Sequence, residues 1–121
     1  MSMLVWTGVV LVGGAGAILR FLIDGAVSSR TGGGFPFGTL AVNLSGAALL
    51  GFVTGLALGH DQALLAGTAA IGSYTTFSTW MLETERLGEE SGAALLATNV
   101  TVSLLFGILA VAAGRALGGL L

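Results

Sequence analysis

Residues 72–80 read Gly-Ser-Tyr-Thr-Thr-Phe-Ser-Thr-Trp. This stretch places five serine and threonine hydroxyls within seven residues, in the second half of an apolar segment that runs from about residue 63 to 82. Hydroxyl side chains can satisfy the backbone groups that are freed where a membrane helix is interrupted. The stretch therefore predicts a third helix that breaks in mid-membrane and then resumes.

The surrounding sequence is typical of a membrane protein and not of a soluble domain. Of its 121 residues, 55% are hydrophobic and 8% are charged, whereas roughly 25% are charged in an ordinary soluble domain. A domain of this size cannot bury so much apolar surface in its own core. The remainder must face lipid, and we expect an all-α membrane protein.

Four membrane spans fit into the chain, as a single transmembrane domain over residues 1–121. A span needs roughly 20 apolar residues. Arg20 and Asp24, four residues apart, should pair near the membrane surface where the first span ends. A loop from Gly25 to Pro36 should separate the first two spans, and a turn at His60 should make the second and third antiparallel neighbours. The predicted spans are about 3–23, 37–58, 63–82 and 93–113.

Several function classes are excluded by what the chain lacks. It has no cysteine, so it has no disulfide and no thiolate metal site. Its four basic and six acidic residues include no basic run that could hold nucleic acid. His60 stands alone, without the neighbouring ligands that a metal site needs. We therefore expect neither an enzyme nor a nucleic-acid-binding protein.

Small and polar residues recur every fourth position in two of the spans. In the second span the series is Asn43, Ala47, Gly51 and Gly55, and in the fourth it is Asn99, Ser103 and Gly107. Residues four apart share one face of a helix, and small residues there allow helices to approach closely. The asparagines have two interpretations, which the sequence leaves open: they join helices, or they donate hydrogen bonds into a pore.

A broken third helix would also offer sites for ions. Freed carbonyl groups suit a small cation such as Na⁺, whereas freed N–H groups and hydroxyls suit an anion. Phe77 and Trp80 are three residues apart, so both rings can line one side of the resumed helix. Aromatic ring edges carry partial positive charge and could face an anion.

Three blocks of the sequence resemble the Fluc fluoride channel family, which is also called CrcB, and the resemblance covers nearly the whole chain. They are Gly13-Gly14-Ala15-Gly16-Ala17-Ile18-Leu19-Arg20-Phe21, Pro36-Phe37-Gly38-Thr39-Leu40-Ala41-Val42-Asn43, and the stretch 72–80. The resemblance implies a four-helix subunit that forms an antiparallel, dual-topology dimer with two fluoride pores. It also implies one structural Na⁺ at the dimer centre, where the two broken helices cross.

The resemblance further implies roles for individual residues of this chain. Gly72 and Thr75 would offer backbone carbonyls to the central Na⁺, and Arg20 would lie in the aqueous vestibule. The fluoride pore would be lined by Asn43, Phe77, Ser78, Thr79, Trp80 and Ser103.

Three positions depart from the pattern of that family. Trp80 stands where phenylalanine is usual, and Ser73 stands where a second glycine is usual. Asn99 stands about where a tyrosine is common. Trp80 would change the geometry of the aromatic part of the pore, and Asn99 would make its wall more polar.

We therefore expect a channel that passively exports fluoride across the inner, or plasma, membrane as a multi-pass protein. Three arginines are expected on one side of the membrane and one on the other, which sets the orientation of the subunit only weakly. The subunit would therefore pair with a second copy of itself or with a paralogue. One rival is a small four-helix proton-coupled exporter, which needs a membrane carboxylate that the stretch 3–23 lacks. The other is a non-transporting accessory subunit, which leaves the hydroxyl-rich third span unexplained.

Overall fold

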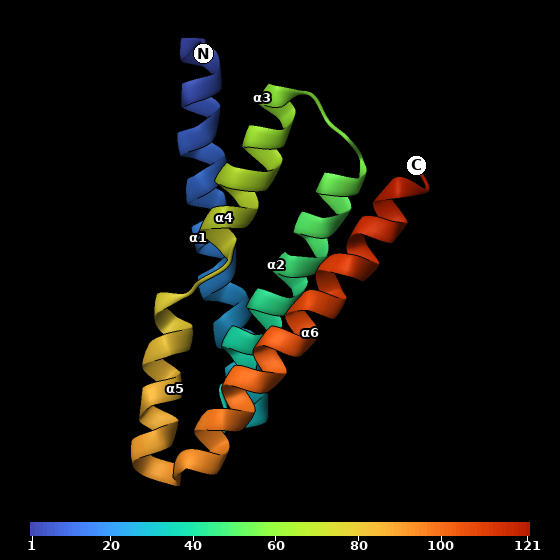
Figure 1. Ribbon diagram of the computed structural model, residues 1–121. Coiled ribbons are helices and arrows are strands. Elements are labelled where there is room, and N and C mark those ends of the chain that lie inside the picture. The colour runs from blue at the N-terminus through green and yellow to red at the C-terminus, as the bar shows by residue number, and fades with distance from the viewer.

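The computed structural model describes residues 1–121, and it is all-helical, without strands. Figure 1 shows its helices running roughly along one direction, with both chain termini toward the same end. The elements are α1 (Met3–Thr31), α2 (Phe37–Gly55), α3 (His60–Ala63), the π-helix η1 (Leu64–Ile71), α4 (Gly72–Tyr74), α5 (Ser78–Ser91) and α6 (Ala93–Gly119). The predicted all-α class is confirmed.

Three of the helices, α1, α2 and α6, are long and apolar enough to cross a membrane. Their outward faces carry large apolar side chains that are mostly exposed, among them Phe21, Leu11 and Ile108. The buried core is correspondingly small, with Val42 as its only large apolar side chain that is fully buried. A surface of this kind is stable only when it faces lipid or another protein.

The first helix is longer than the predicted first span, and the prediction of a loop from Gly25 was wrong. α1 continues to Thr31, and the loop comprises only Gly32–Pro36. The Thr31 hydroxyl donates to the Val27 carbonyl at 3.0 Å, which supports the last turn. The helix ends at Gly32 because this residue has φ 78°, a backbone conformation that favours glycine. The limits of the membrane spans themselves stay predictions.

The expected pairing of Arg20 with Asp24 is also absent. The one salt bridge in the structure joins Arg86 to Glu83. The Asp24 carboxylate instead accepts a hydrogen bond from the Ser28 hydroxyl at 3.1 Å. It lies against the first turn of α2, where a Cβ atom on Gly38 would come within 2.0 Å of Asp24 Oδ1.

Glycines allow α2 and α6 to pack against each other. A Cβ atom added to Gly51 would lie 2.1 Å from the carbonyl oxygen of Val111, and one added to Gly114 would lie 2.0 Å from that of Ala48. The small-residue spacing of the second span therefore marks a real helix contact. In the fourth span the close contacts are made by Gly114 and Gly118, whereas a Cβ atom added to Gly107 would meet nothing within 4 Å.

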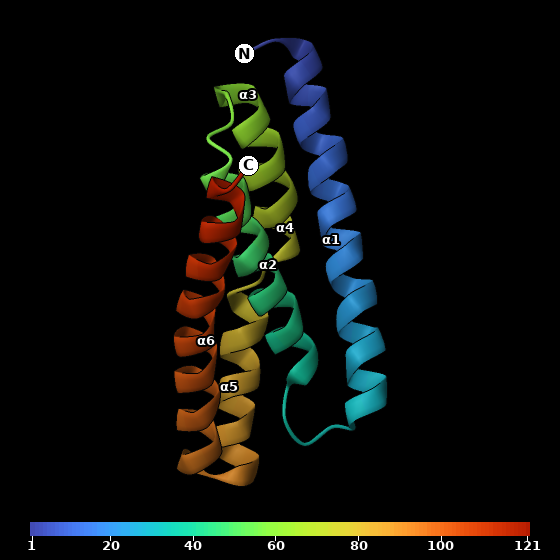
Figure 2. The ribbon, with the colours of Figure 1, turned by 90° about the vertical axis from the view of Figure 1, so that its right-hand side faces the viewer.

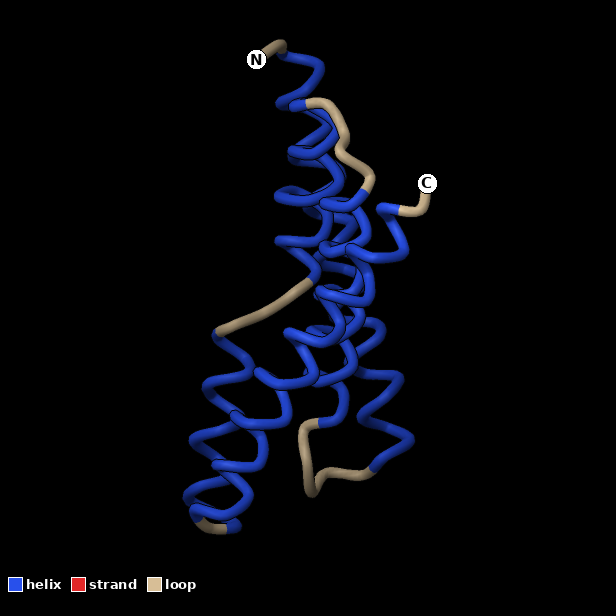
Figure 3. Tube along the Cα trace, turned by 45° about the vertical axis from the view of Figure 1, so that its right-hand side comes forward, coloured by secondary structure: helices blue, strands red, loops and turns tan.

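The third apolar segment is interrupted, as the sequence predicts. α3, η1 and α4 form one continuous helical run, the chain leaves helical geometry at Thr75, and α5 begins at Ser78. Figure 3 shows this interruption near the middle of the molecule, while the other loops lie at its ends. Figure 2 shows α2 between α1 and α6, and α2 packs against both, while η1 and α4 pack chiefly on α1 and α5 packs chiefly on α6.

The contact of α1 with η1 gives a test of this packing. A Cβ atom on Gly16 would lie 2.4 Å from the Ala70 carbonyl oxygen, whereas one on Gly14, two residues away, has nothing within 4 Å. We expect Gly16→Ala to destabilise the protein by about 1–3 kcal/mol, because the methyl group forces the helices apart. Gly14→Ala should leave the melting temperature in detergent unchanged or slightly raised. Equal melting temperatures for the two variants would contradict the packing.

Candidate functional site

The break in the third segment leaves two sets of backbone groups without helical partners. Thr75 is extended, with φ −80° and ψ 161°. No backbone N–H from Thr76 onward donates back across the break, so the carbonyl groups of residues 72–75 accept no backbone hydrogen bond. The N–H groups of Phe77, Ser78 and Trp80 likewise have no acceptor. Carbonyl oxygens thus end one half-helix, and N–H groups begin the other.

Asn43 on α2 holds the break open through the backbone of Thr76. Its Nδ2 donates to the Thr76 carbonyl at 2.8 Å, and its Oδ1 accepts from the Thr76 N–H at 2.8 Å. The side-chain amide thus replaces the peptide partners that a continuous helix would supply. A primary amide has two N–H donors, so one N–H of Asn43 stays available for another acceptor.

Two further residues of α2 fit against the break. The hydroxyl groups of Ser45 and Tyr74 lie 2.9 Å apart and share a hydrogen bond. Gly46 faces Thr75, and a Cβ atom there would come within 2.3 Å of Thr75 Cγ2. Only a residue without a side chain at position 46 lets α2 approach this closely.

Thr76 also starts the second half-helix. Its hydroxyl oxygen accepts a hydrogen bond from the Thr79 N–H at 3.2 Å, as a capping residue does at the beginning of a helix. The side chain and the backbone of this residue are therefore both engaged in fixing the break.

Two cavities flank the interruption, and Thr76 lines both. The larger, about 510 Å³, has polar lining residues that include Asn43, Thr75 and Thr76, and its aromatic lining residues are Phe77 and Trp80. The smaller, about 200 Å³, lies between α1, α2 and the start of α5. Its lining residues are Arg20, Phe21, Asp24, Thr39, Val42, Thr76 and Thr79.

Two buried side-chain atoms at these cavities have no hydrogen-bond partner. They are Nε of Arg20 and Nε1 of Trp80, and they are the only such atoms in the structure. Arg20 lines the smaller cavity and Trp80 the larger. Both atoms are N–H donors. A buried donor without an acceptor is costly, by about 1–3 kcal/mol.

Phe77 and Trp80 form an aromatic pair at the larger cavity. Their ring centroids are 5.7 Å apart and the planes meet at 77°, an edge-to-face arrangement. Phe77 is 69% exposed, so its ring is available to a further partner. The expectation that both rings line one side of the resumed helix agrees with this geometry.

The structure brings most of the predicted site residues together, but not all of them. Asn43, Gly72, Thr75, Phe77 and Trp80 line the larger cavity, and Arg20 and Thr79 line the smaller. Ser78 is exposed and lines neither.

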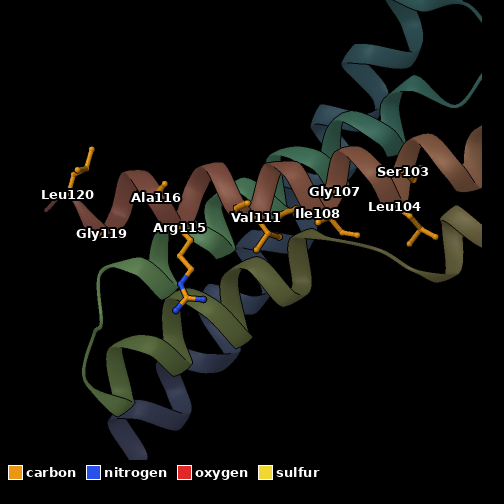
Figure 4. Close-up of a pocket in the computed structure, with 11 residues that line it drawn as sticks. Ser103, Leu104, Gly107, Ile108, Val111, Arg115, Ala116, Gly119 and Leu120 are labelled. Carbon is orange, nitrogen blue, oxygen red and sulfur yellow. The ribbon is translucent and has the colours of Figure 1, made fainter.

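Ser103 lies apart from the break. It lines a groove along α6 together with residues such as Leu104, Gly107 and Ile108 (Figure 4). This groove adjoins the larger cavity, because Ala47 and Val111 line both. The functions predicted for all these residues stay predictions.

Several residues at the site were not singled out from the sequence. The Thr39 hydroxyl is buried and donates to the Glu83 carboxylate, which links α2 to α5. Thr76 was recognised only as one member of the hydroxyl-rich stretch, although its backbone is the partner of Asn43. The sequence feature that could have pointed to Thr39 is its position in the block 36–43, one helical turn before Asn43.

Asn99 joins helices. It is 1% exposed, and its Nδ2 donates to the Thr84 hydroxyl at 2.8 Å. That hydroxyl in turn donates to the Trp80 carbonyl at 2.7 Å. Of the two interpretations of the asparagines, the joining of helices therefore holds for Asn99, which connects α6 to α5.

Comparison with known proteins shows which family this architecture represents. Residues 7–115 match the family model described as CrcB-like protein, Camphor Resistance (CrcB). A protein of Mycolicibacterium paratuberculosis named fluoride-specific ion channel FluC 2 is 59% identical over 116 residues, which cover 96% of this chain and 95% of that protein.

Two other relatives extend the likeness. The protein of the same name from Mycobacterium tuberculosis is 53% identical over 95% of this chain and 91% of its own length. Fluoride-specific ion channel FluC 1 of Leifsonia xyli is 43% identical over 99% of this chain and 90% of its own length. These matches cover nearly the whole chain, and they show that it belongs to the CrcB family.

Proposed function

We propose that this protein is a fluoride-selective ion channel that passively exports fluoride across the cell membrane and lowers its toxicity in the cytoplasm. The proposal is supported by relatives at up to 59% identity that are named fluoride-specific ion channels. The protein is a channel of the inner membrane and not an enzyme. Its several apolar helices make it a multi-pass membrane protein.

The observation that carries the proposal is the chemistry of the unsatisfied groups at the break. Both buried side-chain atoms without a partner are N–H donors, and the freed N–H groups of the α5 N-terminus include that of Trp80 itself. An anion accepts hydrogen bonds and donates none, so it completes this set, and the positive end of the α5 dipole favours it further. Fluoride is small and binds hydrogen-bond donors strongly.

Selectivity then arises from short-range donors and not from a general attraction for anions. All four basic residues of the chain are arginines, and only Arg20 lines a cavity at the break. Arg20 raises the local concentration of anions beside the smaller cavity. The donors at the narrow break then replace the water shell of fluoride, and the larger chloride ion fits them less well.

The opposite half of the break supports a structural Na⁺. The carbonyl oxygens of Gly72 and Thr75 accept no backbone hydrogen bond, and they end a half-helix whose dipole is negative there. Carbonyl oxygens are the ligands that hard cations take. One chain supplies too few oxygens, so a second copy would complete the site.

We further propose four membrane crossings, with the third helix broken in mid-membrane, and an antiparallel dimer formed with a second copy or a paralogue. The position of both termini toward one end of the molecule supports an even number of crossings (Figure 1). Apolar side chains that remain exposed on α1 and α6 supply surface for lipid and for the second subunit. The predicted contribution of Ser103 to a pore requires that the α6 groove face that subunit.

Proton-coupled export is the second candidate, because α1 is longer than the sequence suggested. Asp24 belongs to α1 and lines the smaller cavity beside Arg20. Its carboxylate accepts a hydrogen bond from the Ser28 hydroxyl. The two mechanisms differ in their dependence on a pH gradient.

Purified protein in liposomes tests the main proposal. With K⁺ and valinomycin to balance charge, we expect fluoride to leave rapidly while chloride stays inside, because only fluoride is matched to the donors at the break. A fluoride electrode and a chloride electrode measure the two fluxes. Efflux that needs an imposed pH gradient would favour the exporter, and fluoride retained under all conditions would contradict transport by this chain alone.

Two arginines give a matched pair of variants for the same assay. Arg20→Gln should lower fluoride flux about tenfold or more, since a hydrogen bond to a charged group contributes roughly 1.5–3 kcal/mol. Arg30→Gln, near the end of α1 and lining neither cavity, should leave the flux unchanged. Equal loss in both variants would indicate a general effect of net charge.

Na⁺ should stabilise the folded dimer. We expect the melting temperature in detergent to rise with Na⁺ and not with N-methyl-D-glucamine at equal ionic strength, because only Na⁺ fits between carbonyl oxygens. At a concentration about one hundred times its Kd, the ion contributes about 2.7 kcal/mol. Identical melting curves in the two salts would contradict a structural Na⁺.

A further inference from the structure

We infer that Asp24 restricts the entry of fluoride into the smaller cavity by opposing the positive charge of Arg20, an inference that rests on the proposed function. Asp24 is the only acidic side chain that lines this cavity, and Arg20 is the only basic one. An anion is attracted by one of these charges and repelled by the other. The carboxylate of Asp24 thus sets the rate at which anions pass through this cavity.

The first observation is that the two charges lie on one helix without forming an ion pair. They are four residues apart on α1, yet the one salt bridge in the structure joins Arg86 to Glu83. An acidic residue that follows a basic one by four positions pairs less well than one that precedes it. Each charge therefore acts separately on an ion that enters the cavity.

The second observation is that the carboxylate of Asp24 is held between α1 and α2. It accepts a hydrogen bond from the Ser28 hydroxyl at 3.1 Å. A Cβ atom on Gly38, in the first turn of α2, would collide with the side chains of both Asp24 and Ser28. The absence of a side chain at position 38 therefore leaves room for the carboxylate at the edge of the cavity.

The third observation is the order of the two charges along α1. Asp24 is four residues nearer than Arg20 to the end of the helix at Thr31, which is about 6 Å along the helix axis. Figure 2 shows the loop that follows α1 at one end of the molecule. An anion that enters the cavity from this end reaches the carboxylate before it reaches Arg20.

The acidic residue Glu83 does not act on the cavity in the same way. It does not line the cavity, and its carboxylate accepts a hydrogen bond from the Thr39 hydroxyl. Arg86 lies 3.9 Å from it and balances its charge. Asp24 has no basic partner, so its charge is the one that opposes Arg20.

Asp24→Asn tests the inference, with Asp61→Asn as its matched control. Asparagine keeps an oxygen that can accept from Ser28 and removes only the charge. Asp61 lies in α3 and lines neither cavity, so its substitution makes the same change of net charge elsewhere. Fluoride efflux is measured from liposomes of neutral phosphatidylcholine, at fluoride concentrations below saturation, so that entry limits the flux.

We expect Asp24→Asn to raise fluoride efflux about threefold or more, because Arg20 then attracts anions without opposition. Asp61→Asn should leave the efflux unchanged. The gain should shrink when potassium isethionate is raised from about 0.01 M to about 1 M, since the screening length falls from about 30 Å to about 3 Å. A purely structural role of Asp24 predicts instead a lower melting temperature in detergent and no gain in efflux.

The wild-type protein supplies a second readout, which does not depend on the folding of a variant. Because Arg20 and Asp24 compensate each other, wild-type efflux should change by less than about twofold over the same range of salt. A steep fall of wild-type efflux with salt would overturn the inference. Efflux through folded Asp24→Asn that does not exceed wild-type efflux would also overturn it and leave the channel function standing. Absence of wild-type efflux would overturn the proposed function, and this inference with it.

Discussion

Two hydrogen bonds between the side chain of Asn43 and the backbone of Thr76 hold the break in the third membrane segment. An unpaired peptide group in hydrocarbon costs several kcal/mol. A helix in a membrane therefore stays continuous unless another group takes over its hydrogen bonds. Here a side-chain amide does so from the neighbouring helix α2, and Gly46 lets that helix approach closely enough.

At the break, two helix termini of opposite partial charge lie close together. The half-helix that stops at Tyr74 presents carbonyl oxygens, and the half-helix that starts at Ser78 presents N–H groups. The first suits a cation and the second an anion. Side chains extend the second end, since Arg20 and Trp80 both bring buried donors to it. The proposed binding of a small anion rests on this second end and on the donors beside it.

Much of this arrangement could be predicted from the sequence, because it depends on local composition. Five hydroxyls within seven residues predicted the interruption, and small residues spaced by four predicted that the second span packs closely against a neighbouring helix, which the structure shows to be α6. Pairings between distant segments could not be predicted in the same way. The partner of Asn43 is a backbone group 33 residues away, which no periodicity reveals. Asn99 looks equivalent to Asn43 in the sequence, yet it is buried against Thr84. The sequence could not distinguish the two asparagines, because the faces of a uniformly apolar helix cannot be assigned from its pattern. α1 also extends beyond its apolar stretch, because the Thr31 hydroxyl near its end donates a hydrogen bond to the Val27 carbonyl of the same helix.

Amide hydrogen exchange at Thr76 tests the role of Asn43 most directly. If the side-chain amide braces the break, the Thr76 N–H of the wild-type protein in micelles exchanges slowly although it lies outside any helix, while its neighbour Phe77, which has no acceptor, exchanges faster. In Asn43→Leu, which keeps the side-chain size and removes both hydrogen bonds, exchange at Thr76 should rise to the rate of Phe77. Equal exchange at Thr76 in the two proteins would contradict the brace.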